Sequence, residues 1–171
     1  MGIIKVFFLF AIFGLAVYIG NSKANQYVAR VRELISIKSS LNILENKIKF
    51  TQTPLEEIFE SIAEQCSENN IKNLFQKLSE ELKQNMNIRK SWEKTINIED
   101  TSLNKDDTKI LIDMGKILGT TDVEGQVSNI KITSSFIDRQ IENAEQEKEK
   151  NAKMFRTLGI VSGLTIIIIL I

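Results

Sequence analysis

Two apolar stretches, one at each end of the chain, dominate the pattern of hydrophobic and polar residues. Residues 6–19 carry no charged or strongly polar side chain, and residues 158–171 contain only two hydroxyl side chains among apolar ones. A helix of about 20 residues, at 1.5 Å per residue, spans the roughly 30 Å core of a bilayer. Arg156 can extend its head group from the second stretch to the lipid surface. The pattern therefore predicts transmembrane helices at residues 1–22 and 154–171, and lipid as a partner.

A cleaved signal peptide is the alternative interpretation of the first stretch. Lys5 gives it a charged start, and Ser22 and Ala24, on either side of Lys23, are small residues of the kind that a signal peptidase requires. Cleavage would accompany export of the middle of the chain, whereas retention would leave it tethered to the membrane. The sequence leaves both alternatives open.

The distribution of basic side chains predicts the orientation of a retained protein. Four Lys or Arg residues follow the first apolar stretch and four precede the second, whereas only Lys5 lies on an outer flank. Because Lys and Arg concentrate on the cytoplasmic flanks of membrane spans, we expect a cytoplasmic middle domain with both termini outside. The flanking residues are Lys23, Arg30, Arg32, Lys38, Lys148, Lys150, Lys153 and Arg156.

Between the two ends, apolar residues recur every three or four positions, as in amphipathic helices. Residues 23–153 therefore predict an all-α bundle of about six helices, with the first and last helices antiparallel. Thr53, Pro54 and Glu56 predict a helix start with Thr53 as the N-cap of a capping box, and Gly119 predicts a helix end. The predicted internal faces of the four middle helices comprise Leu55, Ile58, Phe59, Ile62, Ala63 and Cys66; Ile71, Leu74, Phe75, Leu78 and Leu82; Ile88, Trp92 and Ile96; and, after Asn104, Leu111, Met114, Ile117 and Leu118.

The last helix of the bundle has the most regular pattern. Its apolar and small residues alternate steps of four and three, a 3.5-residue repeat typical of coiled-coil packing, and Asp122 stands at the N-cap position. Continued through the charged residues 145–153, the pattern predicts one helix over residues 123–171. The repeat consists of Val123, Val127, Ile130, Ser134, Ile137, Ile141 and Ala144.

Small residues at four-residue spacing lie in both apolar stretches. Ala16 and Gly20 form one such step, and Gly159 and Gly163 form a G-x-x-x-G step. Small residues let membrane helices approach closely, so these four are candidates for packing between the two spans or against a partner's span, including one from a second copy. Glycine and alanine are also common in membrane helices without such a role.

The chemistry available to the chain is limited, because it has no His and one Cys. We predict no catalytic, metal-binding or cofactor-binding residue, and no enzymatic activity. Cys66 and Trp92 lie on apolar helix faces, which predicts a buried thiol and a core aromatic residue. Residues 24–153 carry 19 basic and 22 acidic side chains, a charge of −3 that disfavours a nucleic-acid partner.

Several motifs in order give the chain a resemblance that covers nearly its whole length. An N-terminal span is followed by residues 41–48, Thr53-Pro54-Leu55, Trp92, the sequence GKILGTTD at 115–122 with Gln126 four residues later, and Leu158-Gly159 before an apolar tail. This order resembles the stage III sporulation protein AB family. The chain departs from the family pattern at Lys47, Phe50 and Thr121, where an acidic residue, Tyr and Ser are usual.

The resemblance implies a role in the assembly that forms during endospore formation across the membranes between mother cell and forespore. The soluble part of this family is similar to the helical cytoplasmic domain of the inner-membrane platform proteins of type II secretion and type IV pilus machines. The implied function is a platform in the mother-cell membrane, with other stage III channel proteins and especially the AA ATPase as partners.

The polar residues Asp122, Glu124 and Gln126 then have two alternative meanings. They either cap and brace a tight connection between helices, or present polar groups to a partner. Two other functional classes stay open at this point, namely a two-span sensor that relays helix rotation and a membrane-bound enzyme.

Overall fold

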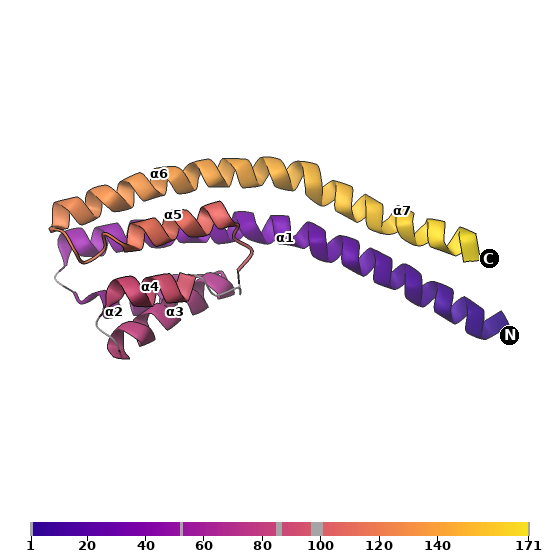
Figure 1. Cartoon of the computed structure of the whole chain (residues 1–171), viewed down its shortest axis with the longest axis horizontal. Helices are drawn as coiled ribbons and strands as arrows, with labels where there is room; N and C mark the ends of the chain where they lie inside the picture. The colour runs from indigo at the N-terminus through magenta and orange to yellow at the C-terminus, as the bar shows by residue number, and fades with distance from the viewer. Residues whose placement is uncertain (1, 52, 85–86, 97–100, 171) are drawn as a thin grey trace. The chain divides into compact units, whose positions relative to one another are not determined.

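The chain is helical through most of its length in the computed structural model, which describes residues 2–51, 53–84, 87–96 and 101–170. These residues contain no strand, which confirms the predicted all-α class. Met1 and Ile171, at the outer ends of the predicted spans, lie outside the described residues. Figure 1 shows the helices, which are α1 (Gly2–Phe50), α2 (Leu55–Gln65), α3 (Asn69–Gln84), α4 (Ile88–Ile96), α5 (Lys105–Gly115), α6 (Val123–Glu147), the π-helix η1 (Lys148–Ala152) and α7 (Lys153–Leu170).

Two compact units share the long helices. The terminal unit comprises Met1–Val31 and Asn143–Ile171, and the central unit comprises Arg32–Glu142. Both divisions fall inside the predicted bundle domain of residues 23–153, so the compact units differ from the predicted domains. The predicted boundaries mark where the chain enters a membrane, and they stay a prediction. The α1 helix continues without a break from the apolar stretch into the central unit.

Three aromatic rings occupy the core of the central unit. The ring centroid of Phe59 in α2 lies 5.9 Å from that of Phe75 in α3 and 5.6 Å from that of Trp92 in α4. Trp92 is buried, as predicted, and its indole Nε1 donates a 2.7 Å hydrogen bond to the backbone oxygen of Leu111. The α5 helix meets the indole ring at Gly115, where an added Cβ would lie 2.2 Å from Trp92 Cδ1. Only glycine fits at this contact.

One helix start follows the sequence pattern and another does not. Asn104 caps α5, because its side chain accepts hydrogen bonds from the backbone of Asp106 and Asp107 while the Asp107 carboxylate accepts one in return. The predicted Thr53 cap of α2 is wrong, since Pro54 occupies the N-cap position with an extended ψ of 147° and no side chain caps the helix. Thr53 therefore precedes the cap by one residue, too early for its hydroxyl to serve the first turn.

The α5 helix ends earlier than predicted. Its last residue is Gly115, and the chain continues in turns in which the backbone N–H of Leu118 donates to the oxygen of Met114. Gly119 has a φ of 75°, so it supplies the left-handed residue of the turn and does not end the helix. The turn directs Leu118 into the core, where its side chain is buried.

Within the central unit, α1 and α6 run antiparallel, as predicted. Lys38 pairs with Asp138, and the Glu45 carboxylate lies 3.7 Å from Lys131 Nζ, so the residue numbers rise along one helix as they fall along the other. Val123 begins α6 and is exposed, although it was the first residue of the predicted 3.5-residue repeat and was expected to be buried. The apolar residues that α1 buries in this unit are Leu34, Ile37, Leu41 and Leu44.

The buried residues of the predicted 3.5-residue repeat form a seam along α6, and the register of this seam changes after Ala144. Ile130, Ile137 and Ala144 are buried at intervals of seven residues, but the next buried residue is Ala152, eight residues on. The π-helix η1 lies in this interval and adds one residue to the turn. The extra residue rotates the following helix so that Gly159 faces inward again. The prediction of an uninterrupted α-helix over residues 123–171 is therefore wrong at η1.

We expect Gly115→Ala to lower the free energy of unfolding by about 2–3 kcal/mol, because the new methyl group overlaps the Trp92 ring. The measurement is urea unfolding of the full chain in detergent, followed by far-UV circular dichroism. In a Trp92→Phe background the same substitution should cost less, because the smaller ring leaves room. Costs that simply add in the double variant would show that another contact requires the glycine.

Candidate functional site

The α1 and α7 helices approach each other closely in the terminal unit. A Cβ added to Gly20 would lie 2.7 Å from the backbone oxygen of Phe155 and 2.9 Å from the Cα of Gly159. A Cβ on Gly159 would lie 2.9 Å from the Ala16 oxygen, and one on Gly163 would lie 3.4 Å from the Ala16 Cβ. The structure thus brings all four predicted span-packing residues to one contact.

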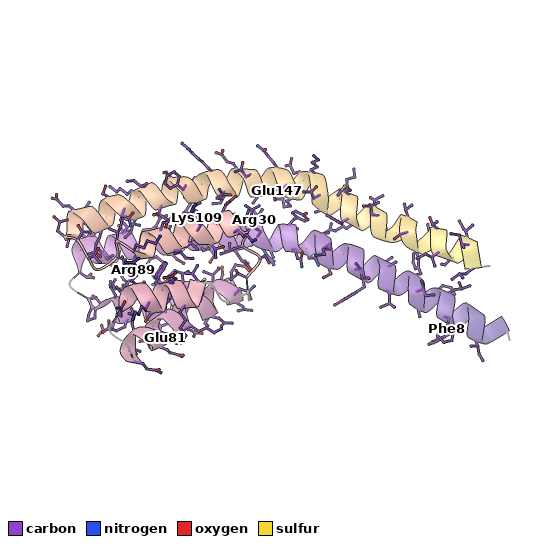
Figure 2. The ribbon with its side chains drawn as sticks, viewed as in Figure 1. Phe8, Arg30, Glu81, Arg89, Lys109 and Glu147 are labelled. Atoms are coloured by element: carbon purple, nitrogen blue, oxygen red, sulfur yellow. The ribbon has the colours of Figure 1, made fainter. Side chains whose placement is uncertain are left out.

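The outward surface of this pair of helices is apolar. Large hydrophobic side chains are exposed along both helices, including Phe8, which Figure 2 labels. Two helices, Phe7–Phe50 and Val123–Leu170, are long and apolar enough to cross a membrane. An exposed apolar surface of this kind is typical of contact with lipid or protein.

An ion pair between a buried Arg30 and an exposed Glu147 joins α1 to the end of α6 in the terminal unit. Arg30 Nη1 donates a 2.8 Å hydrogen bond to Glu147 Oε2, and the Arg30 side chain is only 6% exposed (Figure 2). Beside it the rings of Tyr27 and Phe155 stack at a centroid distance of 5.9 Å. From the sequence we counted Arg30 only as a flanking charge, because its partner lies 117 residues away.

A second buried charge lies in the central unit. The Glu33 side chain accepts a 2.7 Å hydrogen bond from Asn70 Nδ2 of α3 and another, of the same length, from the backbone nitrogen of Ser102. Glu33 is 1% exposed, and burial raises the pKa of its carboxyl above 4.5, although these two hydrogen bonds oppose the shift. The carboxyl group thereby connects α1, α3 and the segment before α5. The sequence pattern did not single out this residue, because both partners are distant along the chain.

Two of the three polar residues predicted to brace the connection before α6 or to contact a partner make hydrogen bonds within the chain. Asp122 Oδ1 accepts a 2.9 Å hydrogen bond from the backbone nitrogen of Gly125, which makes Asp122 the N-cap of α6. Gln126 accepts a hydrogen bond from the Gly119 nitrogen and donates one to the Thr121 oxygen, so its amide closes the turn. The third residue is Glu124, which is exposed and whose side chain makes no hydrogen bond or ion pair among the described residues, so it is the member most available to a partner.

Cys66 lies in a groove of about 310 Å³ between α1 and the α2–α3 connection of the central unit. The thiol is half-buried, not buried as predicted, because α2 ends at Gln65 and Cys66 begins the connection. Its Sγ lies 3.0 Å from Ser36 Oγ. Among the described residues, no group of three or more His, Cys, Asp or Glu side chains is placed to hold a metal ion.

The family model of stage III sporulation protein AB matches residues 5–171. The chain belongs to the stage III sporulation protein AB family. Stage III sporulation protein AB of Bacillus subtilis strain 168 is 31% identical over 154 residues, which cover 88% of this chain and 90% of the relative. A solved structure of stage III sporulation protein AB is 26% identical, has a TM-score of 0.67, and matches over 71% of this chain and 98% of its own.

Membership in the stage III sporulation protein AB family assigns the chain a role in sporulation and confirms the resemblance that its motifs indicated. The family is named for a stage of sporulation and not for an enzymatic activity. The described features fit contact surfaces: a close helix pair, an ion pair at the buried Arg30, a buried carboxylate at Glu33, a braced turn and a groove.

We expect the Glu33 carboxyl to make stability depend on pH. The folded chain holds this proton more tightly than the unfolded chain, because the pKa is raised in the fold. Raising the pH from about 4.5 to about 7.5 should therefore lower the unfolding free energy of the wild type relative to Glu33→Gln, whose amide does not ionise. Urea unfolding at several pH values measures this difference. A wild-type unfolding free energy that rises with pH relative to Glu33→Gln would instead show that the two N–H donors hold the group as an anion.

The close contact in the terminal unit predicts different results for two glycines of α1. Gly20→Ala should lower the free energy of unfolding of the full chain in detergent by about 1–3 kcal/mol, because backbone atoms of α7 lie where the methyl group would be. Its melting temperature should fall accordingly. Gly14→Ala is the matched control, since no heavy atom among the described residues lies within 4 Å of its added Cβ. Equal melting temperatures for the two variants would contradict a contact between α1 and α7 at Gly20.

Proposed function

We propose that the chain is a non-enzymatic membrane platform of the secretion-like channel that connects mother cell and forespore, and that it docks a secretion-type ATPase. In this proposal it is a two-span protein of the mother-cell membrane that engulfs the forespore. The central unit lies in the cytoplasm and both termini lie outside. The proposed ATPase is the AA protein of the same stage III set, with other stage III channel proteins as neighbours.

The observation that carries this proposal is the continuity of the long helices. The α1 helix passes from its apolar segment into the central unit without a break. A second helical path, α6 to η1 to α7, leads from the central unit back to the C-terminal apolar segment. A central unit attached by two helices supports anchoring of a partner at the membrane, because helices resist stretching and bending more than loops do.

The polar turn before α6 is the proposed contact for the ATPase. Asp122 and Gln126 are engaged in internal hydrogen bonds, which keep the backbone of the turn in one conformation. Glu124 is exposed beside them at the start of α6. A fixed turn that presents one carboxylate offers a partner a preorganised contact, which lowers the entropic cost of binding.

The test is calorimetric titration of the purified AA ATPase into the full chain in lipid nanodiscs, with and without a nucleotide. We expect association at micromolar concentrations. Glu124→Gln should weaken the association about threefold or more, because a rim charge is removed without disturbing the turn. Glu142→Gln, on the exposed side of the same helix, is the matched control. No association in either nucleotide state would contradict ATPase docking, and equal effects of the two variants would contradict the contact at Glu124.

A further inference from the structure

A small groove lies between α2 and α3 of the central unit and shares no lining residue with the groove at Cys66. Its volume is about 200 Å³. Small-molecule sites usually occupy roughly 300–1,000 Å³, so this groove is sized for one long side chain. It is lined by Glu60, Ala63 and Glu64 of α2 and by Gln76, Ser79, Glu80 and Lys83 of α3.

The groove carries an excess of negative charge. The segment over residues 55–84 contains seven acidic and three basic side chains, a net charge of −4. Glu60 pairs with Lys83 at 2.7 Å, and this hydrogen bond, followed by the nearby charges of Glu60, Glu56 and Glu57, raises the pKa of Lys83. Among the described residues, neither Glu64 nor Glu80 has a partner, and both are exposed. Two free carboxylates thus flank the groove.

Ser79 supplies an observation that does not depend on charge. Its side chain lines the groove, is only 3% exposed, and has no hydrogen-bond partner for its Oγ among the described residues. A buried hydroxyl without a partner costs about 1–3 kcal/mol, so such groups are rare in folded proteins. Rotation of the Ser79 side chain about its Cα–Cβ bond can turn this covered oxygen toward a donor that enters the groove.

We propose that the α2–α3 groove binds an arginine side chain on a basic surface of a partner protein. The guanidinium group would lie between the Glu64 and Glu80 carboxylates and donate one N–H to Ser79 Oγ. Arginine fits because its planar group offers five N–H donors in several directions and stays charged. The aliphatic part of the side chain would lie along Ala63, which is buried at the base of the groove.

Other occupants fit the groove less well. A nucleic acid or an anionic lipid would meet the net negative charge. A divalent metal ion needs several converging oxygen ligands, and no such group of carboxylates is placed for one among the described residues. The inference goes beyond the proposed ATPase platform, since it rests on the groove alone and holds for any partner with a suitably placed arginine.

The experiment uses the full chain in nanodiscs of a zwitterionic lipid, so that a cationic probe does not bind the bilayer. The probe is a fluorescent helical peptide with two arginines one turn apart, and binding is measured by fluorescence anisotropy. A peptide with citrulline in place of arginine, which is neutral and nearly the same shape, is the probe control. We expect the arginine peptide to bind at least about tenfold more tightly than the citrulline peptide.

Variants of the groove separate a specific site from general attraction. Glu64→Gln with Glu80→Gln should weaken binding of the arginine peptide about tenfold, and Ser79→Ala should weaken it about threefold. Ser79→Ala should also keep or raise the melting temperature, because it removes a buried hydroxyl without a partner. The charge-matched control is Asp106→Asn with Glu142→Gln, which removes two carboxylates outside the groove and should change binding less than about twofold.

Three results would overturn the assignment. Equal weakening by the control pair would show that net charge alone attracts the peptide. Equal binding of the citrulline peptide would show that the guanidinium charge is not recognised. Displacement of the peptide by millimolar calcium at constant ionic strength, lost in the Glu64 and Glu80 variants, would assign the groove to a metal ion. Because the ATPase is absent from every arm, failure here leaves the outcome of the ATPase titration unaffected.

Discussion

The antiparallel pairing of α1 with the helices at the other end of the chain is the interaction on which both units depend. The central unit stabilises it with large apolar side chains such as Leu34, Leu41 and Ile137, which the hydrophobic effect buries. The terminal unit secures it with Gly20 and Gly159, where backbones meet directly. This change in side-chain size fits a change in solvent. Lipid does not drive apolar surfaces together, so helices within it depend on close van der Waals contact.

The paired helices also need a correction of register, and the π-helix η1 supplies it. A seam with a seven-residue repeat drifts around a straight α-helix by about 20° per repeat. After the seam of α6, the extra residue of η1 returns Gly159 to the buried face. The Arg30–Glu147 pair lies immediately before this correction. A buried guanidinium without its carboxylate would be costly, so the pair favours one axial alignment of the helices over a shift by one residue.

The sequence pattern predicts those parts of this fold that follow from one-sided burial along a helix. The all-α class, the antiparallel first and last helices and the buried Trp92 follow from such periodicity. The errors occur at the ends of helices. Thr53 lies one residue before the N-cap of α2, and Cys66 lies one residue after the last residue of α2. Glu33 and Arg30 were missed for a different reason. A charged residue resembles a surface residue until folding brings its partner from a distant part of the chain.

The hydrogen bonds of the polar groups distinguish residues that build the fold from residues that are free to meet a partner. At the turn before α6, Asp122 and Gln126 make hydrogen bonds within the chain, so substitution there would first affect folding. In the α2–α3 groove, the Ser79 hydroxyl is buried without a partner among the described residues, and the Glu64 and Glu80 carboxylates are unpaired there too, whereas Glu60 pairs with Lys83. A fold gains nothing from that hydroxyl, since alanine would occupy the same helical position at lower cost. A cost of this kind is expected at a surface that is completed only when a partner binds.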